Sequence, residues 1–162
     1  MKIGVLSDTH LHRSERDLRL LFDRYLVDVD LILHAGDYVS SDIIGFLSRK
    51  PFHGVRGNMD SLEVKMSLPE KKVIELEGYR IGLIHGWGSP EGLENRITDE
   101  FRDVDAIVYG HSHKPANHVS EGVLFFNPGT VTGFSPKGIH TFGILECGDT
   151  LHGEIIQIGA CR

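Results

Sequence analysis

Short apolar runs alternate with segments of helical spacing in the first third of the chain. Residues 2–7 and 30–33 predict strands, and the second is continuous in leucine and isoleucine, as in a strand buried on both faces. Ser14 is a predicted helix N-cap. The buried face of the helix that follows is predicted to comprise Leu18, Leu21, Phe22, Tyr25 and Leu26. A second helix over about 41–49 and a short strand near 53–56 complete a β-α-β-α-β order.

The second half of the chain is richer in predicted strands. Residues 72–76 and 79–84 read as a hairpin, because Glu77-Gly78 is a turn pair between two apolar runs. A helix is predicted over 90–102 and a strand over 106–109. An antiparallel set with glycine-containing turns is predicted from residues 123–126, 140–147 and 151–158. Two packed sheets covered by helices fit this order, and so does one large mixed sheet.

Composition and charge restrict the class of protein. The 162 residues suit one domain spanning 1–162. The first apolar run stops at Leu6 and no run approaches the ~18 residues of a membrane span, so we expect a cytoplasmic protein without membrane contact. The net charge is −6 with no basic stripe, so stable nucleic-acid binding is not expected. Cys147 and Cys161 form no metal knuckle and are expected to be reduced thiols.

Aspartate, asparagine or histidine side chains follow five of the apolar strands directly. Ligand sites gather at the carboxyl ends of parallel strands, so these side chains are expected to share one site. The residues are Asp8, His10, Asp37, Asn58, His85, His111 and His113. Glycine flanks most of them, and glycine permits the close backbone approach that an ion cluster requires.

The donor types and their number indicate the metal. Carboxylate, amide and imidazole groups suit manganese, iron, zinc, nickel or cobalt better than calcium. Seven candidate ligands exceed the needs of one ion, and two divalent ions about 3.5–4 Å apart would use them all. Such a pair polarises a phosphoryl oxygen and lowers the pKa of a bridging water, which makes that water a nucleophile near neutral pH.

The motifs SDTH, GD, GNMD, HG and GHSH, in this order, resemble those of the calcineurin-like metallophosphoesterase superfamily. Length and spacing resemble its small bacterial and archaeal phosphodiesterase branch. The resemblance implies an α/β (α+β) fold, a four-layer αββα sandwich of two mixed β-sheets flanked by helices. It also implies that Asn127-Pro128-Gly129-Thr130 is a structural loop.

The resemblance implies a role for each of the seven residues. The first metal would be held by Asp8, His10 and His113. The second would be held by Asn58, His85 and His111, and Asp37 would bridge both. Asp37, Asn58 and His85 are also assigned as catalytic. Manganese is the first candidate, with iron, nickel, zinc and cobalt as the others.

One position departs from the motif of many phosphatases in this superfamily. They carry histidine after the motif asparagine, whereas this chain has Met59, which can neither donate a proton nor carry a charge. The phosphodiesterase branch often lacks this histidine too, so the departure favours diesters with good leaving groups. Asp60 is expected to support a ligand by hydrogen bonding.

The predicted function is hydrolysis of a small phosphodiester, or another phosphorylated substrate, by a hydroxide that bridges two metal ions. The alternatives are a phosphomonoesterase on the same site and a protein-interaction scaffold of the same fold, with a homo-oligomer as a further expectation. Near the motifs, Arg56 suits either a phosphate clamp or a surface ion pair, and Trp87 either a cleft wall or packing. We expect a packing role for His34 and a surface position for His118.

Overall fold

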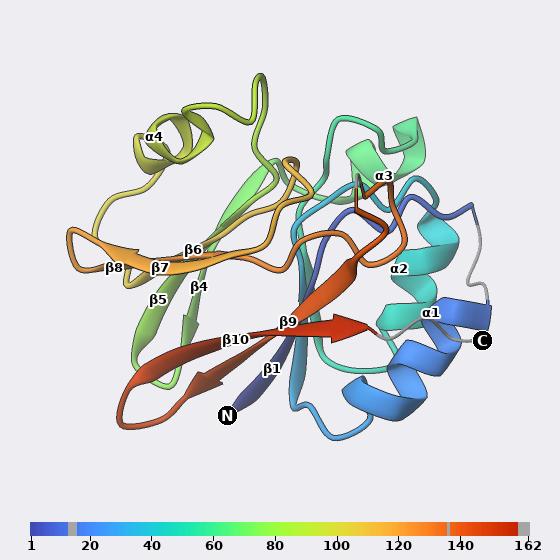
Figure 1. Ribbon diagram of the computed structural model, residues 1–162, viewed down its shortest axis with the longest axis horizontal. Coiled ribbons are helices and arrows are strands. Elements are labelled where there is room, and N and C mark those ends of the chain that lie inside the picture. The colour runs from blue at the N-terminus through green and yellow to red at the C-terminus, as the bar shows by residue number, and fades with distance from the viewer. Residues whose placement is uncertain (13–15, 136, 159–162) are drawn as a thin grey trace.

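The computed structural model describes residues 1–12, 16–135 and 137–158, which form two mixed five-stranded sheets packed face to face (Figure 1). The first sheet has the order β10 (Leu151–Ile158), β9 (His140–Cys147), β1 (Lys2–Leu6), β2 (Leu31–His34) and β3 (Phe52–Gly54). The second has the order β4 (Lys71–Leu76), β5 (Tyr79–Ile84), β6 (Ala106–Val108), β8 (Val123–Asn127) and β7 (Ala116–Ser120). Within each sheet three successive strands are parallel: β1, β2 and β3 in the first, and β5, β6 and β8 in the second.

Helices cover the outer face of each sheet. The first sheet is covered by α1 (Arg16–Leu21), the π-helical turn η1 (Phe22–Leu26) that continues it, α2 (Ser41–Leu47) and α3 (Leu62–Ser67). The second sheet is covered by α4 (Leu93–Thr98). The order helix, sheet, sheet, helix confirms the four-layer αββα sandwich and settles the choice that the apolar pattern left open.

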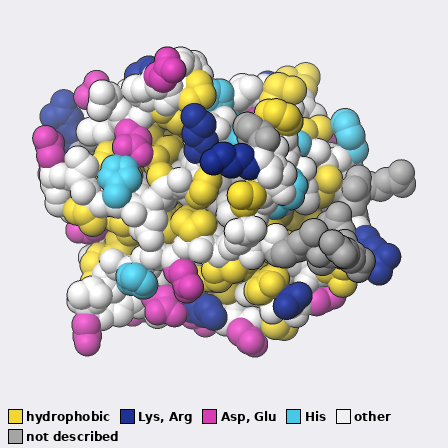
Figure 2. Space-filling model, viewed as in Figure 1, with side chains coloured by type: hydrophobic (Ala, Val, Ile, Leu, Met, Phe, Trp, Pro, Cys, Tyr) yellow, Lys and Arg dark blue, Asp and Glu magenta, His cyan; other side chains and the backbone are white. Residues whose placement is uncertain are grey.

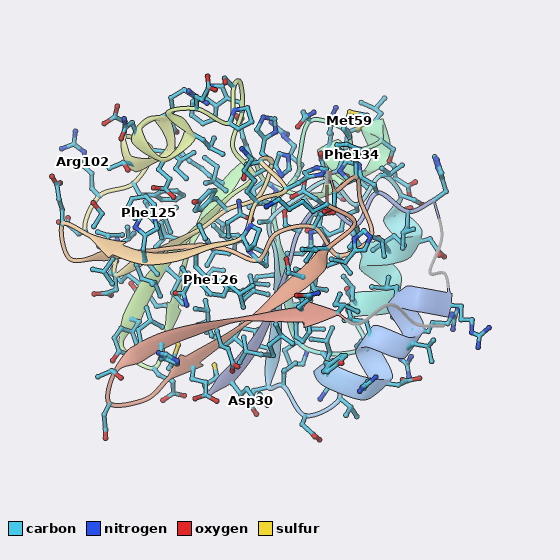
Figure 3. All side chains as sticks on the ribbon, in the orientation of Figure 1. Asp30, Met59, Arg102, Phe125, Phe126 and Phe134 are labelled. Carbon is cyan, nitrogen blue, oxygen red and sulfur yellow. The ribbon has the colours of Figure 1, made fainter. Side chains whose placement is uncertain are left out.

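The core has three apolar layers that follow from strand alternation. One layer lies between the sheets, and the other two lie between each sheet and its helices. Phe125 and Phe126 of β8 illustrate the alternation, because adjacent strand residues point to opposite faces. Phe126 is fully buried between the sheets, whereas Phe125 packs under α4 with Ile97 (Figure 3).

Three sequence predictions differ from the observed elements. The predicted helix over 90–102 is shorter, Leu93–Thr98, and its start is delayed by Gly92, which adopts a left-handed backbone with φ 68°. The three C-terminal runs do not form one antiparallel set: β8 pairs in parallel with β6, and β9 and β10 join the first sheet. The pattern also missed β7 and α3, whose residues are mostly polar or exposed. The predicted cap at Ser14 lies outside the described residues.

Charged side chains of both signs occur together on one face of the molecule. On the face shown in Figure 2, lysine and arginine side chains are spread among acidic and apolar ones. None of the helices in the described ranges is long and apolar enough to cross a bilayer. Cys147 is a buried free thiol, and Cys161 lies outside the described ranges.

Candidate metal centre

All seven predicted site residues meet where the two sheets present the ends of their parallel strands. Three loops come from the first sheet, after β1, β2 and β3, and two come from the second sheet, after β5 and β6. Asp8 Oδ1 lies 3.2 Å from His113 Nε2 and 3.6 Å from His10 Nε2. The first and last motifs, more than a hundred residues apart in sequence, therefore share one carboxylate.

Asp37 and Asn58 connect this group to the remaining histidines. Asp37 Oδ2 lies 3.3 Å from His85 Nε2 and 3.6 Å from His10 Nε2, so it faces both halves of the cluster. Asn58 Oδ1 lies 3.1 Å from His85 Nε2 and 3.2 Å from His111 Nδ1. The seven side chains thus form one continuous cluster rather than two separate ones.

Backbone carbonyls fix the ring orientation of three histidines. His85 Nδ1 donates to Ala35 O at 2.7 Å, His111 Nε2 to Gly88 O at 2.7 Å, and His113 Nδ1 to Phe134 O at 2.6 Å. Each neutral ring then keeps its lone pair on the other nitrogen, which faces the carboxylates or Asn58. Metal-binding histidines in proteins are oriented in this way, with the outer N–H held by a carbonyl.

The buried carboxylates are held ionised by the surrounding imidazoles. Burial alone would raise the pKa of Asp8 and of Asp37, but the neighbouring histidines lower both, and the pKa of Asp8 falls well below its ordinary value. The Asp8 carboxylate, 3.2 Å from His113 Nε2, in turn raises the pKa of His113. Burial opposes a rise in the pKa of His85, yet hydrogen bonding and the charges of Asp37 and Asp8 raise it.

The cluster fits divalent cations on two observations. Asp8 Oδ1 is fully buried and has no hydrogen-bond partner among the described residues. Two ligand atoms about 2.1 Å from one ion are about 3.0–3.4 Å apart, close to the 3.2–3.6 Å separations around Asp8 and Asp37. Only cations or protons can compensate this many inward lone pairs and negative charges.

Five of the seven residues adopt a left-handed backbone. Their φ angles lie between 47° and 68°, and the residues are Asp8, His10, Asp37, His111 and His113. Non-glycine residues in this region cost about 1 kcal/mol or more each, and such strain clusters at functional sites. The surrounding loops hold the side chains inward at the expense of backbone stability.

Glycine is required at two motif positions because other groups approach closely. A Cβ at Gly57 would overlap Asp37 Oδ1, and a Cβ at Gly110 would overlap Ser7 Oγ and lie 2.7 Å from Asp8 Oδ2. The motif glycines therefore allow the loops of the two sheets to reach the carboxylates.

Other polar residues hold the loops together. The Asp60 carboxylate accepts the N–H groups of Gly57, Val39 and Asp37 at 2.7, 2.8 and 3.2 Å, and so joins the second and third motifs. This is the supporting role predicted for Asp60, although it acts on the main chain rather than on a ligand side chain.

The loop predicted to be structural also reaches the centre. Asn127 Nδ2 donates to Gly110 O at 3.0 Å, and Thr130 Oγ1 donates to Asp8 O at 2.9 Å. Both residues are fully buried. This loop therefore fixes the backbone of the first and last motifs.

Comparison with known proteins agrees with this geometry. The sequence model of one protein family, the calcineurin-like phosphoesterase superfamily domain, matches residues 1–150 of this chain. The chain belongs to the calcineurin-like phosphoesterase superfamily. A probable metallophosphoesterase of Methanothermobacter thermautotrophicus is 37% identical to this chain over 170 residues, covering 100% of this chain and 96% of the relative.

Solved structures place two kinds of protein beside this calcineurin-like phosphoesterase. One, a novel archaeal phosphodiesterase, is 26% identical with a TM-score of 0.77, covering 98% of this chain and 100% of that one. Another, wild-type Vps29 of Entamoeba histolytica in complex with zinc, is 28% identical with a TM-score of 0.70, covering 97% and 99%. The fold is thus shared with a protein described as a phosphodiesterase and with Vps29.

The residues beside the motifs take different roles in this family member. Arg56 forms an ion pair with Glu70 at 3.3 Å, the second of its two predicted roles. His34 is fully buried, stacks on Tyr38 and accepts from Gly36 N, which confirms its packing role. His118 lies on β7, exposed as expected, with Nε2 3.0 Å from Glu94.

No residue pattern indicates the groups that orient the three histidines. They are the carbonyls of Ala35, Gly88 and Phe134, and every residue carries a carbonyl. Ser7 Oγ, which donates to Asp8 Oδ2 at 2.6 Å, was within reach of sequence reasoning because it belongs to the first motif.

Proposed function

We propose that this chain is a metal-dependent phosphodiesterase that uses two divalent ions, manganese first among them. The observation that carries the proposal is the orientation of His85, His111 and His113, whose outer N–H groups are held by carbonyls while their inner nitrogens face the cluster. Two bound ions would polarise a phosphoryl oxygen and lower the pKa of a water between them. Membership of the phosphoesterase family supports this chemistry.

The positions of the seven side chains suggest which ion each of them would hold. Asp8, His10 and His113 surround one side of the cluster, and Asn58, His85 and His111 surround the other. Asp37 faces both sides through one oxygen, which suits it to bridge. The other oxygen accepts the Met59 N–H at 2.8 Å, which fixes the rotation of the carboxylate.

The preference for diesters rests on Met59. Its side chain is exposed and carries no proton donor, and only its backbone N–H takes part in the centre. A leaving group that needs protonation receives no help from this position, so diesters with good leaving groups are the better substrates. An archaeal protein of the same fold that is described as a phosphodiesterase supports the same preference.

A metal-restoration assay tests the proposal. The protein is stripped with chelator, manganese is added back, and hydrolysis of bis(p-nitrophenyl) phosphate is compared with that of p-nitrophenyl phosphate. Faster diester turnover is expected, and Asp37→Ala should abolish it and lower the bound metal. Faster monoester turnover would overturn the diester preference. Failure with every transition metal would overturn the enzymatic function, and full activity of Asp37→Ala would overturn the two-metal assignment.

A further inference from the structure

A pocket of about 200 Å³ opens directly beside the metal centre. Asn58 and His85, which belong to the centre, form part of its wall. Arg56, Glu70 and Trp87 form other parts of the wall. A group bound in this pocket is therefore a close neighbour of a phosphate held at the centre.

Trp87 contributes an aromatic side chain to this wall. It is 42% exposed, and the described residues place no other aromatic ring against it. Its backbone is fixed instead: Trp87 O accepts Arg96 Nε at 3.2 Å and Nη2 at 2.9 Å. The next carbonyl, of Gly88, accepts His111 Nε2. The loop that carries the ring is thus held at its main chain, and the exposed part of the side chain is available to a ligand.

The arginine of the pocket wall is already paired, so the pocket does not favour a second anionic group. Arg56 Nη2 is paired with Glu70 Oε2 at 3.3 Å, and Nη1 donates to Lys65 O at 3.0 Å. The positive charge at this end is therefore already compensated. A volume of about 200 Å³ is below the roughly 300–1,000 Å³ of pockets that hold whole drug-sized ligands. The pocket thus suits one uncharged ring system.

We infer that this pocket binds a nucleobase of the substrate, stacked on Trp87, so that the substrates include nucleotide-type phosphodiesters. Stacking on an aromatic side chain is tolerant of base identity, because every base has a π-face. The inference rests on the proposed function only in placing the phosphate at the metal centre. Binding of a nucleobase can be measured without catalysis.

The test compares two ligands that differ only in the base. Adenosine 5′-monophosphate and ribose 5-phosphate are titrated into zinc-loaded protein, and the emission of Trp87, the one tryptophan in the sequence, reports binding next to the indole. We expect the nucleotide to quench this emission and to bind about tenfold tighter or more. Equal affinities for the two ligands would overturn the inference.

Two substitutions at one position separate stacking from apolar packing. Trp87→Phe keeps an aromatic face and should retain most of the preference, whereas Trp87→Leu should abolish it. Inhibition of chromogenic diester hydrolysis by the two ligands measures this. If Trp87→Leu retained the preference for the nucleotide, the inference would be wrong, but the proposed phosphodiesterase function would be unaffected. If the wild-type protein showed the preference by fluorescence but hydrolysed no ester, the binding site would stand and the proposed function would fail.

Discussion

Replacement of Asp60 by asparagine should weaken both the fold and the metal centre. Asp60 is 5% exposed, and its Oδ2 accepts the N–H groups of Gly57 and Asp37 while its Oδ1 accepts that of Val39. Burial raises the pKa of Asp60, and the hydrogen bonds from these N–H groups oppose the rise. An asparagine carbonyl can replace only one of the two oxygens, so the amide NH₂ must face an N–H donor.

The size of the effect follows from the bond that is lost. If the asparagine oxygen keeps the bonds to Gly57 and Asp37, the N–H of Val39 is left without an acceptor. Such a loss costs about 1.5–3 kcal/mol. Val39 has φ 79°, a rare conformation for a β-branched residue, and the lost bond is the one that holds it there. For a chain of this length the melting temperature should fall by roughly 3–12 °C.

Two measurements check this prediction. Thermal unfolding gives the change in stability, and isothermal titration with manganese gives an expected loss of about 10–100-fold in affinity, the usual effect of removing a group that supports a ligand. Asp105→Asn is the control, because the exposed Asp105 also accepts a backbone N–H, from Arg80 at 2.7 Å, but lies outside the centre. If Asp60→Asn matched the wild type in both measurements, the supporting role would be refuted.

Three further predictions concern the centre itself. Gly57→Ala should abolish metal binding, measured by titration, because its Cβ would overlap Asp37 Oδ1. Manganese should raise the melting temperature more at about pH 8 than at about pH 6. In metal-free protein the pKa values of His85 and His113 are raised, so the stability that their protonated rings contribute is full below about pH 6.5 and is lost as the pH rises through the raised pKa values. Metal binding requires the neutral rings, so protons compete with manganese at the lower pH. Met59→His should raise the ratio of monoester to diester turnover in the chromogenic assays, since it supplies a proton donor at an exposed position beside the centre.

Each of the three has a result that would contradict it. Gly45→Ala, in α2 with no atom within 4 Å of the added Cβ, should bind metal normally, and equal loss in both glycine variants would point to a general defect. A stabilisation by manganese that was constant or fell with rising pH would contradict the proton competition. An unchanged substrate ratio in Met59→His would show that residue 59 does not face the leaving group.

Much of the fold followed from local patterns of residues. The strands β1, β2, β5 and β6 were predicted from apolar runs, and they appear within two residues of the predicted ends. The hairpin of β4 and β5 was predicted from its turn pair, and it pairs in register from Lys71 to Leu76. These elements are determined by neighbours in sequence, which is why a pattern of residues suffices.

Strand pairing between distant segments was not accessible in this way. β8 resembles the other C-terminal strands in composition, yet it lies beside β6 in the second sheet while β9 lies beside β1 in the first. The helix predicted over 90–102 starts only at Leu93, after the left-handed Gly92 of the preceding loop. Partner choice is a property of the packed layers, so no local pattern encodes it.

The sequence by itself determined which seven side chains would be drawn together, because each follows a strand and all are oxygen or nitrogen donors. Only the tertiary structure decided how they are aimed. The rings of His85, His111 and His113 are turned by carbonyls of Ala35, Gly88 and Phe134, which come from other parts of the chain. Main-chain groups are chemically the same at every residue, so their positions, and the geometry they impose, exist only once the two sheets have packed.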